Sequence, residues 1–372
     1  MKIAGLIFGN SGTLTKDMLK KDHLEQRETL FEKVSPLSSS MREEIEKTFL
    51  RSLPIGAEHT FTQIEKEYQI LDLPPADIYV VFPFQSFHDR WLHALYSHNK
   101  PIIISPLPFS KMFSYGNVFY PYFIRDSREI DSMLNLPHNV FLSKDEKDLS
   151  LILRSLYIKH RVNHTRVLCI GEPMYEPFHS WDWGYSMVRV VQEKFGLTWI
   201  QMSSQTFLKH WEEWKERKDI DINDMKKSAH RIYISEEKRL LEAKKMYLAL
   251  KSIIRENKAD AFTINCLASI ILPKLERTPC YALSKLNDEG IPSACEADTT
   301  TLLDMLITVY TSESPGFMAN PYLFPSDNRI LLSHCTSPTL HSYKEKKRDE
   351  FDLYTYFDHP TNLALAPQVL KN

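Results

Sequence analysis

Three short stretches of the chain combine polar side chains that can bind a metal ion with apolar neighbours. They are Ala294–Asp298 (ACEAD), Phe317–Pro321 (FMANP) and Leu332–Cys335 (LSHC). Each lies on or at the end of an expected strand, where a buried polar group without a partner would be costly. A carboxylate, an amide and an imidazole that meet there form an oxygen-rich site with one nitrogen ligand. Such a set of donors favours Mn²⁺ or Mg²⁺ over Zn²⁺.

Strand geometry narrows the choice of ligands within these stretches. Alternate residues of a strand face the same side, so Glu296 and Asp298 point together if the strand continues through Asp298. Asp298 also precedes an expected helix that begins at Thr299, where it would act as an N-cap. On a strand, His334 and Cys335 face opposite sides, and we therefore assign His334 as a ligand and Cys335 to the core.

Each of these residues also has a purely structural interpretation, which the sequence leaves open. Glu296 could be half of a buried ion pair, and His334 could be a hydrogen-bonded histidine of the core. Asn320 stands before Pro321 and could serve only to shape a strand end.

The elements that must position these residues form two α/β series. Continuous apolar strands separated by helical segments predict parallel sheets covered on both faces. In the first series we expect strands at Lys2–Gly9, Ile78–Phe84 and Pro101–Leu107, and helices at Ser40–Leu53 and His88–His98. In the second we expect strands at Val140–Ser143, Thr165–Gly171, Thr198–Ser203, Ala261–Cys266 and Pro292–Ala297, and helices at Leu149–Lys159, Met187–Phe195, Glu236–Asn257, Pro279–Asp288 and Thr299–Tyr310.

The pattern changes after the last of these helices. Gly316–Phe324 and Arg329–Thr336 are expected strands, and the turn-forming residues between them predict an antiparallel hairpin. The sequence therefore predicts three domains. We expect an N-terminal α/β domain at 1–162, a second α/β domain at 163–312 that carries Glu296, and a shortened C-terminal β domain at 313–372 that carries His334.

The stretch Asp260–Pro338 resembles the L-fucose isomerase-like family, which is related at the level of the fold to L-arabinose isomerase. With GEP at 171–173 and the expected helix at 236–257, which fit the same layout, the resemblance covers about half of the chain. The pieces that carry it are DAFTINC at 260–266, NDEGIPSACEAD at 287–298, GFMANP at 316–321 and LSHCTSP at 332–338.

The resemblance implies two Rossmann-like domains followed by a β-barrel domain. It also implies an enzyme that interconverts an aldose and a ketose through an enediol, that uses Mn²⁺ (or Mg²⁺), and that assembles as a trimer or hexamer. Carried over by position, the metal ligands become Glu296, Asn320 and His334. Glu296 would also be the catalytic base.

Asn320 departs from the family pattern, which has an aspartate at this position. An amide oxygen can bind a cation but cannot take up a proton as a base. Asp298 is our first candidate to replace the missing catalytic carboxylate, and Asp288 and Glu289 are two others. A second expectation is therefore a catalytically inactive protein of the same fold that binds a sugar or supports an assembly.

Composition limits the other classes of function. The net charge of −2 gives no strong field to attract nucleic acid or an anionic membrane surface, so we expect neither partner. No apolar run approaches the roughly 18 residues that span a bilayer, and no secretory signal is visible. Because the number of cysteines is odd and most lie in apolar segments, we expect buried thiols in the reducing cytoplasm. The chain has no Cys-x-x-Cys, so we expect no structural zinc site.

Overall fold

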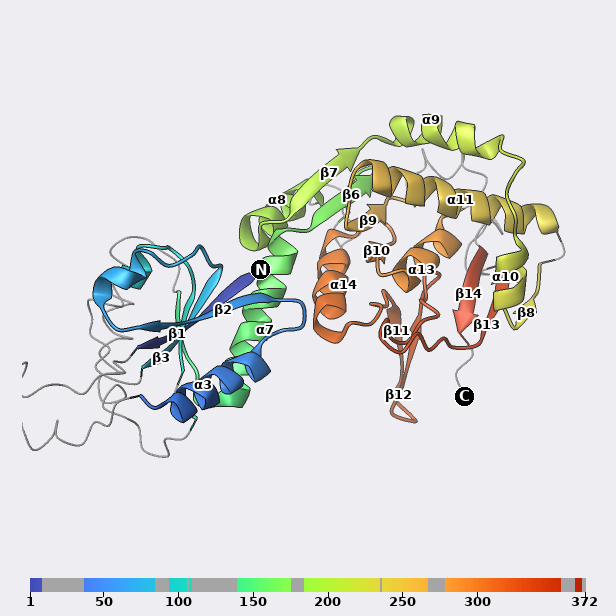
Figure 1. Cartoon of the computed structure of the whole chain (residues 1–372). Helices are drawn as coiled ribbons and strands as arrows, with labels where there is room; N and C mark the ends of the chain where they lie inside the picture. The colour runs from blue at the N-terminus through green and yellow to red at the C-terminus, as the bar shows by residue number, and fades with distance from the viewer. Residues whose placement is uncertain are drawn as a thin grey trace, which may run out of the picture. The chain divides into compact units, whose positions relative to one another are not determined.

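The computed structural model describes residues 1–8, 37–83, 94–105, 107–108, 139–174, 184–234, 236–266, 278–355 and 365–369. The chain forms two compact units, Met1–Tyr157 and Ile158–Asn372 (Figure 1). The expected third domain, 313–372, lies within the second unit, and its existence as a separate domain stays a prediction.

The first unit contains a five-stranded sheet in which every neighbouring pair of strands is parallel. Its strand order is β2-β1-β3-β4-β5. The strands are β1 (Lys2–Phe8), β2 (Glu58–Ile64), β3 (Ile78–Pro83), β4 (Ile102–Ile104) and β5 (Val140–Leu142). The parallel sheet confirms the α/β prediction, although β2 was not expected because most of its residues are polar.

Both faces of this sheet are buried. Leu6 and Val81 belong to one apolar cluster, whereas their neighbours Ile7 and Val80 belong to another. Helices α3 (Ser39–Ser52) and α7 (Glu146–Asn163) flank the sheet together with a 3₁₀ turn, η2 (Glu67–Ile70). Alternate residues of each continuous apolar strand thus pack into the clusters on opposite faces of the sheet, as expected for a parallel sheet that is covered on both faces.

The second unit contains a four-stranded parallel sheet with the order β10-β9-β6-β7. The strands are β6 (Arg166–Ile170), β7 (Thr198–Met202), β9 (Ala261–Ile264) and β10 (Ser293–Ala294). The chain places β7 on one side of β6 and then crosses to place β9 on the other side. In sheets of this kind, ligands bind outside the carboxyl ends of the strands at the point where the order reverses. Here that point lies between β6 and β9.

The helices around this second sheet form two groups (Figure 1). In one group α8 packs against α14, and in the other α9 and α13 both pack against α11. Their bounds are α8 (Gly184–Phe195), α9 (Ser204–Lys215), α10 (Asn223–Ser228), α11 (Glu237–Glu256), α13 (Cys280–Asp288) and α14 (Thr299–Ser312). No helix among the described residues is long and apolar enough to cross a membrane.

Two small sheets complete the second unit. β11 (Asn320–Phe324) and β12 (Arg329–Ser333) form the expected antiparallel hairpin. β13 (Phe351–Thr355) pairs with β14 (Leu365–Val369) and with β8 (Arg231–Ile232). Within the described part of the chain these strands do not close into the expected barrel, because they belong to separate sheets. Most of the expected helix at 88–98 lies outside the described residues.

Candidate functional site

The segments that follow β6, β9 and β10 are tied together at the carboxyl edge of the second sheet. The backbone N–H of Asn265 donates to the carbonyl of Ile170 at 2.8 Å, and its side-chain amide donates to the carbonyl of Glu172 at 2.7 Å. The N–H of Ala297 donates to the carbonyl of Ile264 at 3.0 Å. These bonds bring the three strand ends together where the strand order reverses, the place at which a ligand crevice is expected.

A tight turn presents Glu296 at this edge. The backbone φ is 62° at Glu296 and 53° at Ala297, and the N–H of Asp298 donates to the carbonyl of Cys295 at 3.2 Å. Two central residues with positive φ under such a bond are the pattern of a type I′ turn. Because β10 ends before the turn, the strand does not continue through Asp298, and the condition under which we expected Glu296 and Asp298 to point together is not met. Left-handed backbone at residues other than glycine costs about 1–3 kcal/mol each and is found disproportionately at functional sites.

The carboxylate of Glu296 meets the imidazole of His334. Glu296 Oε1 lies 3.9 Å from His334 Nε2, and the side chains are 21% and 5% exposed. On the other side of the ring, Nδ1 lies 3.0 Å from the hydroxyl of Thr336. Burial lowers the pKa of His334, but the neighbouring Cys335 and Glu296 outweigh burial and raise that pKa to about 10. Cys335 and Glu296 therefore favour the protonated form of the ring.

Asn320, the third expected ligand, begins β11. In the hairpin it pairs with Ser333, the residue directly before His334. Its side chain is exposed. The register therefore places Asn320 on the strand next to the histidine, and its role as a ligand stays a prediction.

Asp298 caps helix α14 from a buried position. Its Oδ1 accepts the backbone N–H groups of Thr300 and Thr301, both at 3.0 Å. The hydroxyls of the same two threonines also donate to the carboxylate, at 2.8 and 2.5 Å. Asp298 therefore acts as the expected N-cap of α14. Its catalytic role stays a prediction.

We expect Asp298→Ala to lower the free energy of unfolding by about 2 kcal/mol, the upper end of the range for an N-cap. Asp298→Asn should lose less, because the amide oxygen can still accept the backbone bonds. Urea unfolding followed by circular dichroism measures both losses. If the asparagine variant keeps wild-type stability but loses the activity of the protein, the carboxylate acts in the reaction as well as in the cap.

Asp288 and Glu289, the other carboxylates considered, are engaged in structural contacts. Asp288 binds the segment that follows His334, through Thr339, Leu340 and Arg348. Glu289 accepts the Tyr247 hydroxyl at 2.5 Å and the Lys251 ammonium at 2.8 Å. These bonds give both residues a structural role, and their catalytic role stays a prediction.

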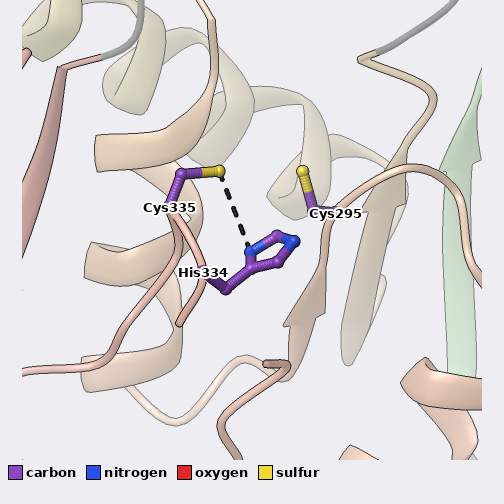
Figure 2. A group of neighbouring side chains, drawn as sticks. All are labelled: Cys295, His334 and Cys335. Carbon is purple, nitrogen blue, oxygen red and sulfur yellow. Dashed lines mark hydrogen bonds between the residues drawn. The ribbon is translucent and has the colours of Figure 1, made fainter. Parts of the chain in front are cut away.

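Two thiols, Cys295 and Cys335, lie beside the imidazole, and two more, Cys266 and Cys280, lie next to these thiols. The sequence did not predict this group. The ligand atoms of Cys295, His334 and Cys335 all lie within 4.8 Å of one another (Figure 2). Cys266 Sγ is 3.0 Å from Cys295 Sγ, and Cys335 Sγ is 3.8 Å from His334 Nδ1. Because β12 ends at Ser333, strand alternation does not separate His334 from Cys335 as we had argued.

The thiols are electrostatically unequal. Hydrogen bonds from the thiols of Cys280 and Cys295, together with the His334 ring, lower the pKa of Cys335 despite its burial. Interaction with Cys335 and burial raise the pKa of Cys280, whereas Cys266 is the main cause that raises the pKa of Cys295. Cys335 is therefore the thiol of this group whose charged form its neighbours favour. The signal that sequence reasoning passed over is that four of the five cysteines fall between 266 and 335, around the metal-binding stretches.

Comparison with models of protein families and with curated proteins finds no match to this chain. The chemistry of the site is therefore argued from its side chains. One side of the imidazole offers a carboxylate that can carry a proton or bind a hard cation, and the other side offers thiols.

Proposed function

We propose that the chain is a metal-dependent aldose–ketose isomerase of the L-fucose or D-arabinose type. The observation that carries the proposal is the 3.9 Å approach of Glu296 Oε1 to His334 Nε2. The two side chains come from distant segments and meet beside the strand ends of a parallel sheet at its reversal point. The two all-parallel sheets also support the Rossmann-like part of the resemblance, and the β-barrel domain remains part of the proposal.

The donors fit a hard divalent ion such as Mn²⁺ or Mg²⁺. Two neighbouring ligands about 2.1 Å from one octahedral ion lie about 3.0 Å apart, so the carboxylate and the imidazole, now 3.9 Å apart, would move together by roughly 1 Å to bind one ion. Glu296 and His334 would hold the ion, with Asn320 as the proposed third ligand. The bound ion would supply stabilisation for negative charge on the sugar oxygens at C1 and C2.

Glu296 would move the proton. Its carboxylate is partly exposed, which leaves it accessible to a sugar in the crevice. It would accept the proton from C2 of the aldose and return it to C1 of the enediol, while the hydroxyl proton passes from O2 to O1, so that no proton is gained or lost overall. The tight turn at 295–298 would limit the positions that the carboxylate can take, as a general base requires.

The test is a turnover measurement on the full chain. The protein is stripped of metal with a chelator, Mn²⁺ or Mg²⁺ is restored, and the ketose formed from L-fucose or D-arabinose is quantified. We expect turnover that depends on the added ion. Ion binding without turnover on any aldose would instead support the inactive sugar-binding or assembly protein, which the neutral Asn320 favours.

The proposal includes a homo-oligomer, a trimer or hexamer, and a cytoplasmic location. The five free thiols support the location. The apolar hairpin β11–β12 supports the assembly, because large side chains on both strands are exposed. They include Leu323 at 69%, Ile330 at 62% and Leu332 at 55%. Exposed apolar patches of this kind mark interaction surfaces.

We expect the double variant Leu323→Lys, Ile330→Lys to reduce the mass of the particle to that of a smaller assembly or a monomer. The two residues pair directly across the hairpin, so two lysines there would place like charges inside the interface. Light scattering after size exclusion measures the mass. Leu151→Lys on α7, where the wild-type residue is 62% exposed, is the matched control. An unchanged mass in the double variant would exclude the hairpin from the interface.

A further inference from the structure

We propose that the thiol side of His334 forms a second metal site, for a soft divalent ion such as Zn²⁺. Its ligands are Cys295 Sγ, Cys335 Sγ and His334 Nδ1. The site goes beyond the proposed isomerase, whose ion would lie on the opposite, Nε2 side of the ring beside Glu296. It also replaces our expectation from the sequence that the chain has no zinc site.

The geometry of the three donors suits a tetrahedral ion. An ion with Zn–S near 2.3 Å and Zn–N near 2.1 Å places its sulfur and nitrogen ligands about 3.6 Å apart. The observed distance from Cys335 Sγ to His334 Nδ1 is 3.8 Å, and each of the three residues has a ligand atom within 4.8 Å of those of the other two. Figure 2 shows both sulfur atoms on the same side of the imidazole, facing a shared space. An ion can therefore be accommodated once the Thr336 hydroxyl, 3.0 Å from Nδ1, moves aside.

The donors sit on segments that are held in place. Cys295 opens the tight turn after β10, and its side chain belongs to the apolar core of the second unit. His334 and Cys335 directly follow β12. Cys266 lies 3.0 Å from Cys295, and Cys280 donates to the hydroxyl of Thr278 at 3.0 Å. Water or one of these two flanking thiols would complete the fourth position of the ion.

The charges of these three ligands suit a divalent ion. Two thiolates and a neutral imidazole carry a charge of about −2, which a divalent cation neutralises, and a buried site requires such neutrality. Thiolate ligands select soft or borderline ions, whereas Mn²⁺ and Mg²⁺ prefer oxygen. The two sides of the imidazole thus suit different classes of ion, because the donors beside them differ.

Co²⁺ is the probe for this site, because it replaces zinc and its spectrum reports sulfur ligands. The full chain, reduced and stripped of metal, is titrated with Co²⁺ in the absence of sugar. We expect thiolate-to-cobalt charge-transfer absorption, intense visible bands of tetrahedral Co²⁺, one ion bound per chain, and displacement by Zn²⁺. Because no turnover is measured, the result is independent of whether the chain is an isomerase.

Single substitutions identify the ligands. Cys335→Ser and Cys295→Ser should each weaken zinc binding by more than about 100-fold, since even outer partners of a metal site contribute 10–100-fold. Cys169→Ser is the matched control, because it removes a fully buried thiol of the same unit that lies outside the group. This variant should keep the wild-type spectrum. Wild-type affinity in a folded Cys335→Ser variant would overturn the proposal.

A measurement on the unmodified chain covers the case in which a variant fails to fold. X-ray absorption at the zinc edge should find two or three sulfur ligands near 2.3 Å and at least one nitrogen near 2.0 Å. A shell of oxygen and nitrogen alone, or the failure of the reduced chain to retain zinc, would overturn the assignment.

Discussion

Replacement of Glu296 by glutamine is expected to reduce Mn²⁺-dependent interconversion of aldose and ketose by about 10²–10⁴-fold, the contribution of a general base. Glutamine is nearly the same size and keeps one oxygen, so the turn at 295–298 should be retained. It cannot take up the proton from C2, and it brings no negative charge to an ion shared with His334. The same variant should bind Mn²⁺ more weakly. Initial rates and isothermal titration measure the two effects separately.

Glu313→Gln is the matched control for this variant. Glu313 is also a glutamate with left-handed backbone, at φ 54°, but it lies at the C-terminal end of α14. It should keep both turnover and affinity for the ion. Wild-type turnover by Glu296→Gln would reject Glu296 as the base, and with it the proposed reaction.

Asp288→Ala is expected to lower the free energy of unfolding by about 3–5 kcal/mol, the effect of breaking a buried ion pair. The carboxylate is 2% exposed and binds Arg348 Nη1 at 2.6 Å. It also accepts the backbone N–H groups of Thr339 and Leu340, both at 2.8 Å, and the hydroxyl of Thr339 at 2.6 Å. Removing the carboxylate leaves these donors without an acceptor in a buried place. Chemical unfolding at neutral pH measures the loss.

The control for Asp288 is an exposed ion pair in the same unit. Asp327 binds Arg329 at the tip of the β11–β12 hairpin, where both side chains are exposed. Asp327→Ala should change stability very little, because water screens such a pair. Equal effects of the two substitutions would show that the contacts of Asp288 do not hold the segment after His334 in place.

The sequence predicted the parallel sheets well because their strands are continuous apolar runs. Ile78–Pro83 is buried at every position, and a short continuous apolar run of this kind is typical of a strand covered on both faces. Strand β2 was missed because Glu58, His59 and Thr60 are exposed and polar at a sheet edge. This segment forms a strand because it pairs with β1, and the composition of the segment alone does not indicate that pairing.

The candidate site could be predicted only in part. The polar residues in apolar surroundings at 296 and 334 gave the correct expectation that these two side chains lie close together. The left-handed turn that presents Glu296 could not be foreseen, because Glu and Ala lack the usual signal of glycine or asparagine at such positions. The thiol group was missed because its members come from separate segments, and each alone is indistinguishable from a buried apolar cysteine.

His334 has one nitrogen on each side, and this limits what the two proposed sites can do at the same time. A neutral imidazole carries one proton, so an ion on Nδ1 confines that proton to Nε2. The N–H would then point at Glu296, as metal-bound histidines commonly donate to a carboxylate. Occupation by zinc would therefore exclude manganese from the ring and engage the proposed base. Traces of zinc would therefore inhibit the proposed isomerase. Protein isolated with zinc would show no isomerase activity until the zinc was removed.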